Sequence, residues 1–386
     1  MKQTENKLMQ KPPTYLKIIA AILFIIILYG GFLLITYAFV ETHDTKMKLI
    51  HYFIPLIILG GTGLLVLVSK FIANILFTLM YTFLGFVLAM ELYMFICAVI
   101  FLIINACVNL PIYVGYIIIL GIPIIICVYG IINVFVTKIE EHSFKVKHLE
   151  KEKVRIVHLS DLHLGAVYQK GFTEKIVKKV IELKPDIVVI TGDLCDGTMQ
   201  VLGDWLSPFD ILTVPVLYIT GNHEQIHGKD LLLRAIETTN IKHIGHEVVE
   251  ICGINFIGVD FEYDLKKRLT ELAPKYKNST KPNVLLCHIP TMKPEELEEY
   301  HIYLFLAGHT HGGQVFPMQL PAYCVNACFA GLYSNKTKTN HVYVSTGIGA
   351  SVVPMRIGSR SVIGVLTFER EEGQEVPINE NAEQKI

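Results

Sequence analysis

The sequence predicts a multi-span α-helical membrane domain followed by an α/β domain. Three observations on the 386-residue chain support this fold class. Residues 15–137 carry few charges, whereas residues 138–386 alternate charged helical patterns with short apolar runs. Hydrophobic residues make up 52% of the chain, and the mean hydropathy of +0.46 is high for an ordinary soluble protein. Part of the chain is therefore expected to lie in lipid.

Charge and cysteine usage argue against other classes of protein. The net charge of −1 is not that of a broad basic surface, so no nucleic-acid polymer is expected as a partner. The eight cysteines show no disulfide spacing, and Cys324 and Cys328 lack the second pair that a zinc finger requires. We interpret all eight as small buried hydrophobic residues, which fits a reducing compartment without establishing one.

Apolar stretches long enough to cross a bilayer, which takes about 20 residues, fill the first part of the chain. They are residues 15–40, 49–68, 71–108 and 112–136. The first is too long in its apolar core for a cleavable signal peptide, and no small-residue cleavage site follows it. The third fits one tilted helix or two short ones. Its only charge, Glu91, is a functional candidate by position, but we expect it to face another helix or an interface.

Lysines flank these stretches unevenly. They cluster at the N-terminus, at Lys70 and between Lys138 and Lys153, and four spans place all three groups on the cytoplasmic side. Lys46 and Lys48 do not fit this pattern, but five spans would break it. We predict a multi-pass cell-membrane protein with a cytoplasmic α/β domain. The predicted segments are a cytoplasmic N-terminal segment (1–14), a transmembrane domain of about four helices (15–137), a linker with the first strand (138–153), the α/β domain (154–370) and a polar, disordered tail (371–386).

Short apolar runs alternate with helical patterns in the second part of the chain. The predicted strands are 142–147, 154–159, 186–191, 214–219, 241–244, 247–251, 254–259, 283–288, 302–307, 341–346 and 361–369. The predicted helices are 172–184, 198–206, 229–238 and 294–300. Parallel βαβ units come first and β-rich pairing follows. In open α/β sheets, ligands bind beyond the carboxyl ends of the strands.

Asp, Asn and His follow five of these strands. The sequences are "SDLHLG" (160–165), "TGDLCDG" (191–197), "TGNHEQ" (220–225), His288 and "GHTHGG" (308–313). Asp161 and His163 stand two positions apart, and such residues point to the same side of an extended backbone. Each piece alone has a structural explanation, such as a helix-capping Asp or a core histidine. Five of them at one edge of a sheet favour a common function.

This set resembles the calcineurin-like metallophosphoesterase superfamily, whose pattern is D-x-H, G-D-x-x-D, G-N-H-[DE], a lone His and G-H-x-H. The resemblance covers roughly residues 142–369 and implies a four-layer α/β/β/α sandwich of two mixed sheets. "GHTHGGQ" (308–314), "VYVSTGIGAS" (342–351) and "PMRIGSR" (354–360) are similar to a membrane-associated bacterial branch. That branch is related to enzymes that cleave UDP-2,3-diacylglucosamine. Glu224 departs from the pattern, because Asp is commoner there.

The resemblance also implies two divalent metal ions and their ligands. The first ion takes Asp161, His163, Asp193 and His311, and the second takes the shared Asp193 with Asn222, His288 and His309. Carboxylate, amide and imidazole together suit Mn, Fe or Zn better than Mg or Ca. Two such ions lower the pKa of a bridging water and clamp the attacking and leaving oxygens. Hydrolysis of a phosphoester by a metal-bridging hydroxide is therefore expected.

Two further residues are expected to take part in the reaction. By the resemblance, His223 is no ligand and stabilises the transition state or protonates the leaving oxygen, a role that suits imidazole. Asp196 is expected to orient His223 or a ligand, although a turn Asp that satisfies backbone amides is an alternative. The other histidines of this part are interpreted as core residues: His158, His227, His243, His246, His301 and His341.

The combined prediction is a membrane-anchored phosphoesterase. It would cleave a phosphodiester or pyrophosphate bond of a lipid-linked or membrane-proximal substrate, with the bilayer as a further partner. We predict that a substrate-binding apolar wall in the loop 314–334 leads from the membrane to the metal site, and that it consists of Phe316, Met318, Leu320 and Tyr323. A satellite core in that segment is the alternative.

Two other functions remain open at this point. One is a tethered nucleotide phosphodiesterase, and the other is a membrane receptor or transport-like protein with a regulatory phosphoesterase module. Intramembrane polar groups are nearly absent, which argues against transport. The sequence does not determine the metal, the substrate or the oligomeric state.

Overall fold

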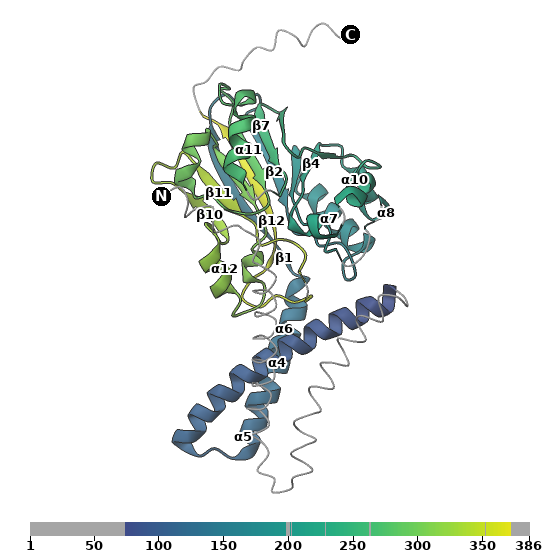
Figure 1. Cartoon of the computed structure of the whole chain (residues 1–386), viewed down its shortest axis with the longest axis vertical. Coiled ribbons are helices and arrows are strands. Elements are labelled where there is room, and N and C mark those ends of the chain that lie inside the picture. Colours follow the sequence, from purple (N-terminus) through teal and green to yellow (C-terminus); the bar gives the residue numbers. More distant parts are fainter. Residues whose placement is uncertain are drawn as a thin grey trace. The chain divides into compact units, whose positions relative to one another are not determined.

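The computed structural model describes residues 74–197, 201, 203–227, 229–261, 264–351 and 353–371 (Figure 1). Contacts divide the chain into two compact units, one of residues 1–132 and 352–355 and the other of residues 133–351 and 356–386. All predicted ligands belong to the second unit. The predicted N-terminal segment 1–14, the spans 15–40 and 49–68, and the tail beyond residue 371 lie outside the described residues.

The described part of the first unit consists of apolar helices. Helix α4 (Asn74–Val108) is a single helix of 35 residues, so the stretch 71–108 is not divided in two where it is described. Helix α5 (Ile112–Tyr116), a π-helical turn and helix α6 (Ile122–Val134) follow one another. Among the described residues, Gly85–Val108 and Tyr113–Val134 are long and apolar enough to cross a membrane, and only 28% and 33% of an 18-residue apolar window in each is buried. Such low burial is unlike that of the core helix of a soluble protein.

The first of two mixed sheets in the second unit has the strand order β1-β12-β2-β3-β4-β5. The strands are β1 (Thr137–Val146), β12 (Ser361–Arg370), β2 (Lys153–Leu159), β3 (Ile187–Thr191), β4 (Val216–Ile219) and β5 (Ile241–His243). The strands from β2 to β5 are parallel, whereas β12 is antiparallel to β2 and parallel to β1. The carboxyl ends of β2, β3 and β4 therefore meet at one edge.

The second sheet has the order β10-β11-β9-β8-β7-β6. Its strands are β10 (Gly331–Ser334), β11 (His341–Val344), β9 (Leu304–Ala307), β8 (Asn283–Cys287), β7 (Ile254–Val259) and β6 (Glu247–Ile251). The four central strands are parallel, and β6 and β10 pair antiparallel at the two edges. The carboxyl ends of β8 and β9 again lie side by side.

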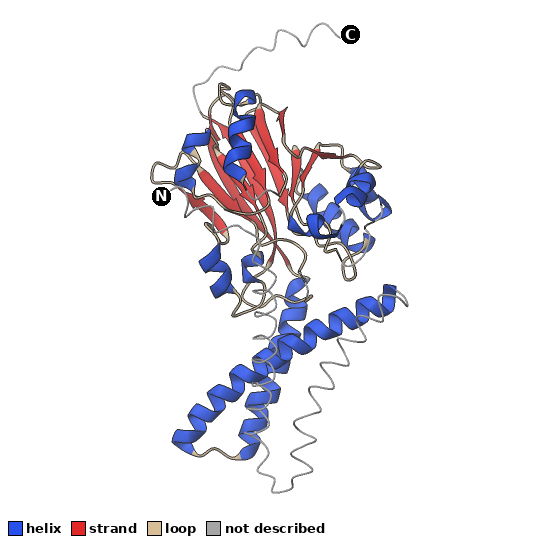
Figure 2. Cartoon of the chain, viewed as in Figure 1, coloured by secondary structure: helices blue, strands red, loops and turns tan. Residues whose placement is uncertain are grey.

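The two sheets pack face to face and carry helices on their outer faces (Figure 2). Val189 of β3 packs with Phe256 and Leu286 of the second sheet, whereas its neighbours Val188 and Ile190 face the helices. A parallel strand covered on both faces is apolar throughout, as β3 is. Helices α7 (Lys170–Glu182), α8 (Gly203–Leu206) and α10 (Lys229–Ile236) cover the first sheet, and α11 (Leu265–Leu272) covers the second. The two-sheet α/β domain predicted from the sequence is confirmed.

Several elements differ from the prediction. Strand β1 begins at Thr137 rather than at residue 142, because all ten of its residues pair with β12. The predicted helix 294–300 consists of two 3-10 turns, Pro294–Glu296 and Glu298–Tyr300. Helix α11 was not predicted, although Asp264 caps it by accepting a hydrogen bond from the Lys267 N–H at 3.0 Å. The segment is short and charged, so one capping residue was not enough to predict a helix there.

The apolar segment 314–334 also contains an unpredicted helix, α12 (Gln319–Val325). Pro321 is its third residue, where a missing N–H costs no intrahelical hydrogen bond. The interpretation of all cysteines as buried is wrong for Cys107 and Cys324, which are exposed at or near helix ends. His301 is exposed as well, and it ends a 3-10 turn in a left-handed conformation.

Candidate metal centre

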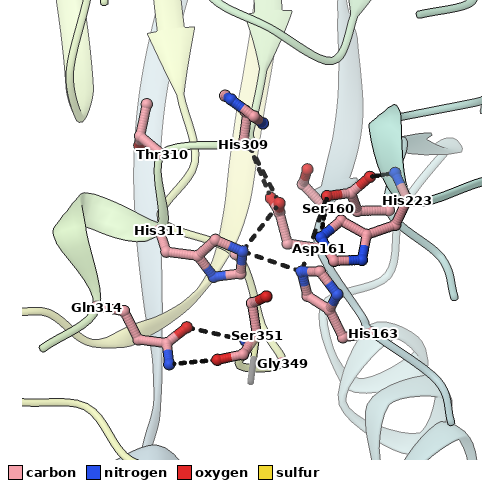
Figure 3. A network of polar contacts seen from close by, with 12 residues as sticks. Ser160, Asp161, His163, His223, His309, Thr310, His311, Gln314, Gly349 and Ser351 are labelled. Atoms are coloured by element: carbon pink, nitrogen blue, oxygen red, sulfur yellow. Dashed lines mark hydrogen bonds and ion pairs between the residues drawn. The ribbon is translucent and has the colours of Figure 1, made fainter. Parts of the chain in front are cut away.

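Six of the seven predicted ligands come together with His223 where strands of both sheets end, and Figure 3 shows Asp161, His163, His309 and His311 among them. Asp161 and His163 follow β2, Asp193 follows β3, and Asn222 begins helix α9 (Asn222–His227) after β4; His288 follows β8, and His309 and His311 follow β9. The donor atoms form three groups within 4.8 Å: Asp161, His163 and His311; His163, Asp193 and His223; and Asp193, His288 and His309. The groups share members, so they form one continuous cluster.

Asp193 lies at the centre of this cluster. Its Oδ2 is 3.1 Å from His288 Nε2 and 3.8 Å from His163 Nε2. The other carboxylate, Asp161, places Oδ1 3.4 Å from His311 Nε2. Asp193 therefore reaches imidazoles from the loops of both sheets, as a shared ligand would.

The backbone of five predicted ligands adopts the left-handed region, which is uncommon for residues other than glycine. The φ angles are +53° at Asp161, +50° at His163, +50° at Asp193, +71° at His309 and +51° at His311. Hydrogen bonds between loops hold these conformations: the Asp161 N–H donates to Gly192 O at 3.1 Å and the His163 N–H to Asp193 O at 3.0 Å. Such strained backbone concentrates at functional sites, because surrounding structure must stabilise it.

The donor set fits a divalent cation. Asn222 Oδ1 is buried and has no hydrogen-bond partner among the described residues. A buried polar atom without a partner costs about 1–3 kcal/mol, which a bound ion would relieve. His288 Nδ1 lies 2.8 Å from Thr191 O. A carbonyl can only accept, so Nδ1 carries the proton and the other ring nitrogen, Nε2, is oriented toward the cluster.

Burial and mutual attraction shift the titration of these groups strongly. Burial lowers the pKa of His163 to about 3 and that of His309 to about 4, so both imidazoles are neutral. Burial and the charge of Asp193 raise the pKa of Asp161 to about 6. Burial opposes the charge on Asp193 and on His288, but their attraction prevails. It holds the pKa of Asp193 below its usual range and raises the pKa of His288 to about 10. Perturbations of this size in a cluster of ligands indicate a functional site.

His223 lies beside the cluster and is open to solvent. Its N–H donates to Asp193 Oδ1 at 3.0 Å, and its Nε2 is 3.9 Å from Asp193 Oδ2. Its side chain is 23% exposed, whereas that of His163 is fully buried. The Nδ1–H of His223 donates to the main-chain carbonyl of Asp196 at 3.0 Å. Asp196 thus contacts His223 through its backbone, and its carboxylate packs against Gly165.

Glu224 supports the cluster, a role that the sequence reasoning missed. The side chain is fully buried, and its Oε1 accepts hydrogen bonds from the N–H groups of Leu194 and Cys195 at 2.6 and 3.1 Å. Its Oε2 accepts from those of Asp193 and Gly221 at 3.1 and 2.6 Å. Burial, followed by the charge of Asp193, raises the pKa of Glu224. The acidic residue in G-N-H-E (221–224) was the only sequence signal that could have indicated this supporting role.

The four predicted wall residues lie on the surface on or just before α12. The exposed fractions are 49% for Phe316, 53% for Met318, 65% for Leu320 and 67% for Tyr323. These side chains do not form a satellite core. Between them and His311, Gln314 exchanges two hydrogen bonds of 2.8 Å with the backbone of Ser351 (Figure 3). The structure therefore groups the ligands and His223 together but leaves the wall residues exposed.

A two-sheet α/β domain with this cluster at its edge defines a metallophosphoesterase domain. Residues 154–313 match the model of the calcineurin-like phosphoesterase family. A protein of Aquifex aeolicus named an uncharacterized metallophosphoesterase is 30% identical over 260 residues, which cover 64% of this chain and 98% of that protein. The chain belongs to the calcineurin-like phosphoesterase family.

Longer relatives match over the same region. An uncharacterized metallophosphoesterase of Helicobacter pylori is 36% identical over 236 residues, or 59% of this chain and 63% of that protein. A bovine (Bos taurus) protein named transmembrane protein with metallophosphoesterase domain is 34% identical over 242 residues, or 56% of this chain and 53% of that protein. The matched region thus spans less than two thirds of these two relatives. Divalent metal ions are a property of the family, and two apolar helices together with the bovine relative's name suggest membrane association.

Proposed function

We propose that the chain is a membrane-anchored metal-dependent phosphoesterase that hydrolyses a phosphodiester or pyrophosphate bond. The single observation that carries this proposal is the cluster itself. Two carboxylates and five imidazoles from the loops of both sheets lie in overlapping groups, and donor atoms within each group are no more than 4.8 Å apart. A set of imidazoles around buried carboxylates attracts a cation and has little other use in a domain core.

Each ligand has a place in the proposed centre. Asp161, His163, Asp193 and His311 would hold one divalent ion, and Asp193, Asn222, His288 and His309 would hold the other. Bound ions of this kind supply Lewis-acid stabilisation of a phosphoryl group and lower the pKa of water. Mn, Fe and Zn suit the mixed donors.

His223 is the proposed proton donor. Its Nδ1–H is fixed on the Asp196 carbonyl, which leaves Nε2 on the side of Asp193. A proton on Nε2 is then directed toward the cluster, where the leaving oxygen of a bound phosphoester would lie. Asp196 fixes this ring orientation through its backbone carbonyl.

The proposed substrate is lipid-linked or membrane-proximal. Two candidate spans precede the domain, and exposed apolar side chains of the wall, such as Phe316 and Leu320, suit an acyl chain or a bilayer surface. The motifs at 308–314, 342–351 and 354–360 resemble a membrane-associated bacterial branch related to enzymes that act on UDP-2,3-diacylglucosamine, which favours the same class. We further propose the multi-pass topology, the cytoplasmic placement of the catalytic domain and the domain boundaries predicted from the sequence.

The test uses the full chain purified in detergent and in lipid nanodiscs. Metal content is measured directly, and hydrolysis is assayed after chelation and after return of Mn²⁺, Fe²⁺, Zn²⁺ or Mg²⁺. The panel holds bis-p-nitrophenyl phosphate, p-nitrophenyl phosphate, a nucleotide diester and UDP-2,3-diacylglucosamine. The proposal expects chelator-sensitive cleavage and a preference for the lipid-linked diphosphate. Metal-loaded protein that cleaves none of them would overturn the phosphoesterase function. A preference for the nucleotide diester would instead favour a tethered nucleotide phosphodiesterase.

A further inference from the structure

Arg356 is a completely buried arginine next to the candidate metal centre. Its Nη1 donates to the carbonyls of His311 and Arg360 at 3.2 and 3.0 Å. Its Nη2 donates to the carbonyls of Thr346, Gly347 and Gly349 at 2.7, 3.1 and 2.6 Å. A guanidinium is a rigid fork of donors with no acceptor. Here it binds main-chain oxygens of three separate segments, which are His311, residues 346–349 and Arg360.

One of these segments holds a ligand of a proposed ion, and a second contacts the loop that holds another ligand of the same ion. His311 is itself a ligand, and its carbonyl accepts from Arg356 directly. The loop after β11 contacts the loop of Asp161, because the Ile348 N–H donates to Ser160 O at 3.0 Å and the Gly349 N–H to Asp161 O at 2.8 Å. Arg356 is therefore one hydrogen bond from the backbone of His311 and two from that of Asp161.

The main-chain carbonyl of Arg356 is hydrogen-bonded to the last turn of helix α6. Asn133, in the last turn of that helix, is buried, and its Nδ2 donates to the carbonyls of Arg356 and Ser359 at 2.9 and 3.0 Å. Ser361 Oγ donates to Val134 O at 2.8 Å. All of these residues belong to the second unit. The residues that end the second candidate span are thus bonded to the segment that carries Arg356.

We propose that Arg356 is a positioning residue of the metal centre and that Asn133 transmits to it the position of the end of α6. The proposal rests on the proposed metal-dependent function of the same site. Arg356 acts by fixing the backbone of His311 and the loop behind Asp161, whose side chains 3.4 Å apart define one ion's place. Lysine would keep the charge but concentrate its donors at one point, so it could not hold all three segments.

The first experiment compares Arg356→Lys and Arg356→Met with a matched control, Arg370→Met, in the full chain. Arg370 ends the strand that follows Arg356 and likewise donates to two main-chain carbonyls, those of Leu149 and Glu150 at 3.0 and 2.9 Å. Mn²⁺ affinity, kcat and KM for bis-p-nitrophenyl phosphate are measured. Emission from Trp205, the chain's one tryptophan, checks folding of the domain.

The Arg356 variants are expected to lose about 10- to 100-fold in Mn²⁺ affinity and kcat, as when support of a metal ligand is removed. KM should change little, and the Lys variant should lie between the wild type and the Met variant. Wild-type metal affinity in folded Arg356→Lys would overturn the proposal, and so would an equal loss in Arg370→Met. Metal affinity is measured without turnover. A metal-binding but inactive wild type would therefore overturn the phosphoesterase function alone, and a wild type that binds no metal would overturn both.

The second experiment tests Asn133 and remains informative if the Arg356→Met variant does not fold. Asn133→Ala is compared with Asn255→Ala, an equally buried control whose Nδ2 donates to Asn283 Oδ1 at 2.9 Å. We expect Asn133→Ala to lower Mn²⁺ affinity several-fold and the control to leave it unchanged. In the double variant Asn133→Ala with Arg356→Lys, the losses should be less than additive. Strict additivity, or no loss in Asn133→Ala, would overturn the transmission through Arg356.

Discussion

The Nε2 atoms of His163 and His311 lie 3.0 Å apart inside the cluster. Burial lowers the pKa of both imidazoles, so neither brings a positive charge to this contact. Two neutral rings from loops 148 residues apart in sequence therefore converge on one point beside Asp161. A cation bound between the two rings would stabilise this geometry. Asp193 lies next to it, with Oδ2 3.8 Å from His163 Nε2.

Asp193→Asn should abolish metal-dependent hydrolysis while the domain stays folded. Asp193 contacts His288 and lies near His163, so loss of its charge removes the shared anion that would offset two cations. We expect activity to fall by more than about 100-fold, the upper range for loss of an outer partner of a ligand. Metal content and turnover are measured together, with Asp204→Asn, an exposed residue paired with Lys170, as the control. Retention of two metals with near-normal turnover would contradict the assignment.

His223→Ala should keep the metals and lose rate in proportion to how poor the leaving group is. A general acid contributes about 100- to 10,000-fold, mostly where the leaving oxygen needs a proton. Rates are compared for p-nitrophenolate and alkoxide leaving groups on otherwise matched diesters. An equal loss for both would assign His223 to phosphate binding or charge stabilisation instead.

Leu320→Asp should impair a lipid-linked substrate far more than a short soluble diester. Leu320 is 65% exposed on α12, so a charge there should not unfold the domain but would repel an acyl chain or bilayer. The control is Ile211→Asp, because Ile211 is 67% exposed on a different part of the domain. The ratio of kcat/KM for the two substrates is the measured quantity. An unchanged ratio would remove the wall's role in substrate choice.

Glu224→Gln should destabilise the domain and weaken metal binding. One of the two carboxylate oxygens becomes an NH₂ donor that faces two N–H groups. Hydrogen bonds to a charged group contribute about 1.5–3 kcal/mol each, so we expect at least about 3 kcal/mol of lost stability. Urea unfolding followed by Trp205 emission gives the free energy, and the exposed Glu174→Gln is the control. Unfolding at the wild-type urea concentration would show that the four N–H groups find other partners.

Stability should fall as the pH drops below about 6.5, partly through His158. Burial between the sheets lowers the pKa of His158 to about 3, and its Nε2 contacts Thr191 Oγ1 at 2.7 Å. Between these two pKa values the unfolded chain binds a proton that the folded chain does not. Each such histidine therefore lowers stability by about 1.4 kcal/mol per pH unit. His158→Gln should reduce this slope while running parallel to the wild type above pH 7. Equal slopes below pH 6 would refute the assignment.

Local patterns were sufficient to predict the described strands except β10, and the clustering of polar residues at one edge of the sheets. Apolar runs such as that of β3 produce strands because both faces are covered, and parallel strands bring Asp161 and Asp193 to one edge. The left-handed backbone at Asp161 was not predictable, because hydrogen bonds from a distant loop stabilise it. The role of Arg356 was hidden for the same reason, since its partners at His311 and Gly349 meet only in the folded chain.

The distribution of the ligands over two sheets has a consequence for assembly. Asp161, Asp193 and Asn222 follow strands of the first sheet, whereas His288, His309 and His311 follow strands of the second. Neither sheet alone offers a full set, so a bound ion would connect the loops of the two sheets. A ligand that binds only the docked state adds about 2.7 kcal/mol at a concentration 100 times its Kd. Metal uptake should therefore follow the docking of the two sheets, and separation of the sheets should release the ions before either sheet unravels.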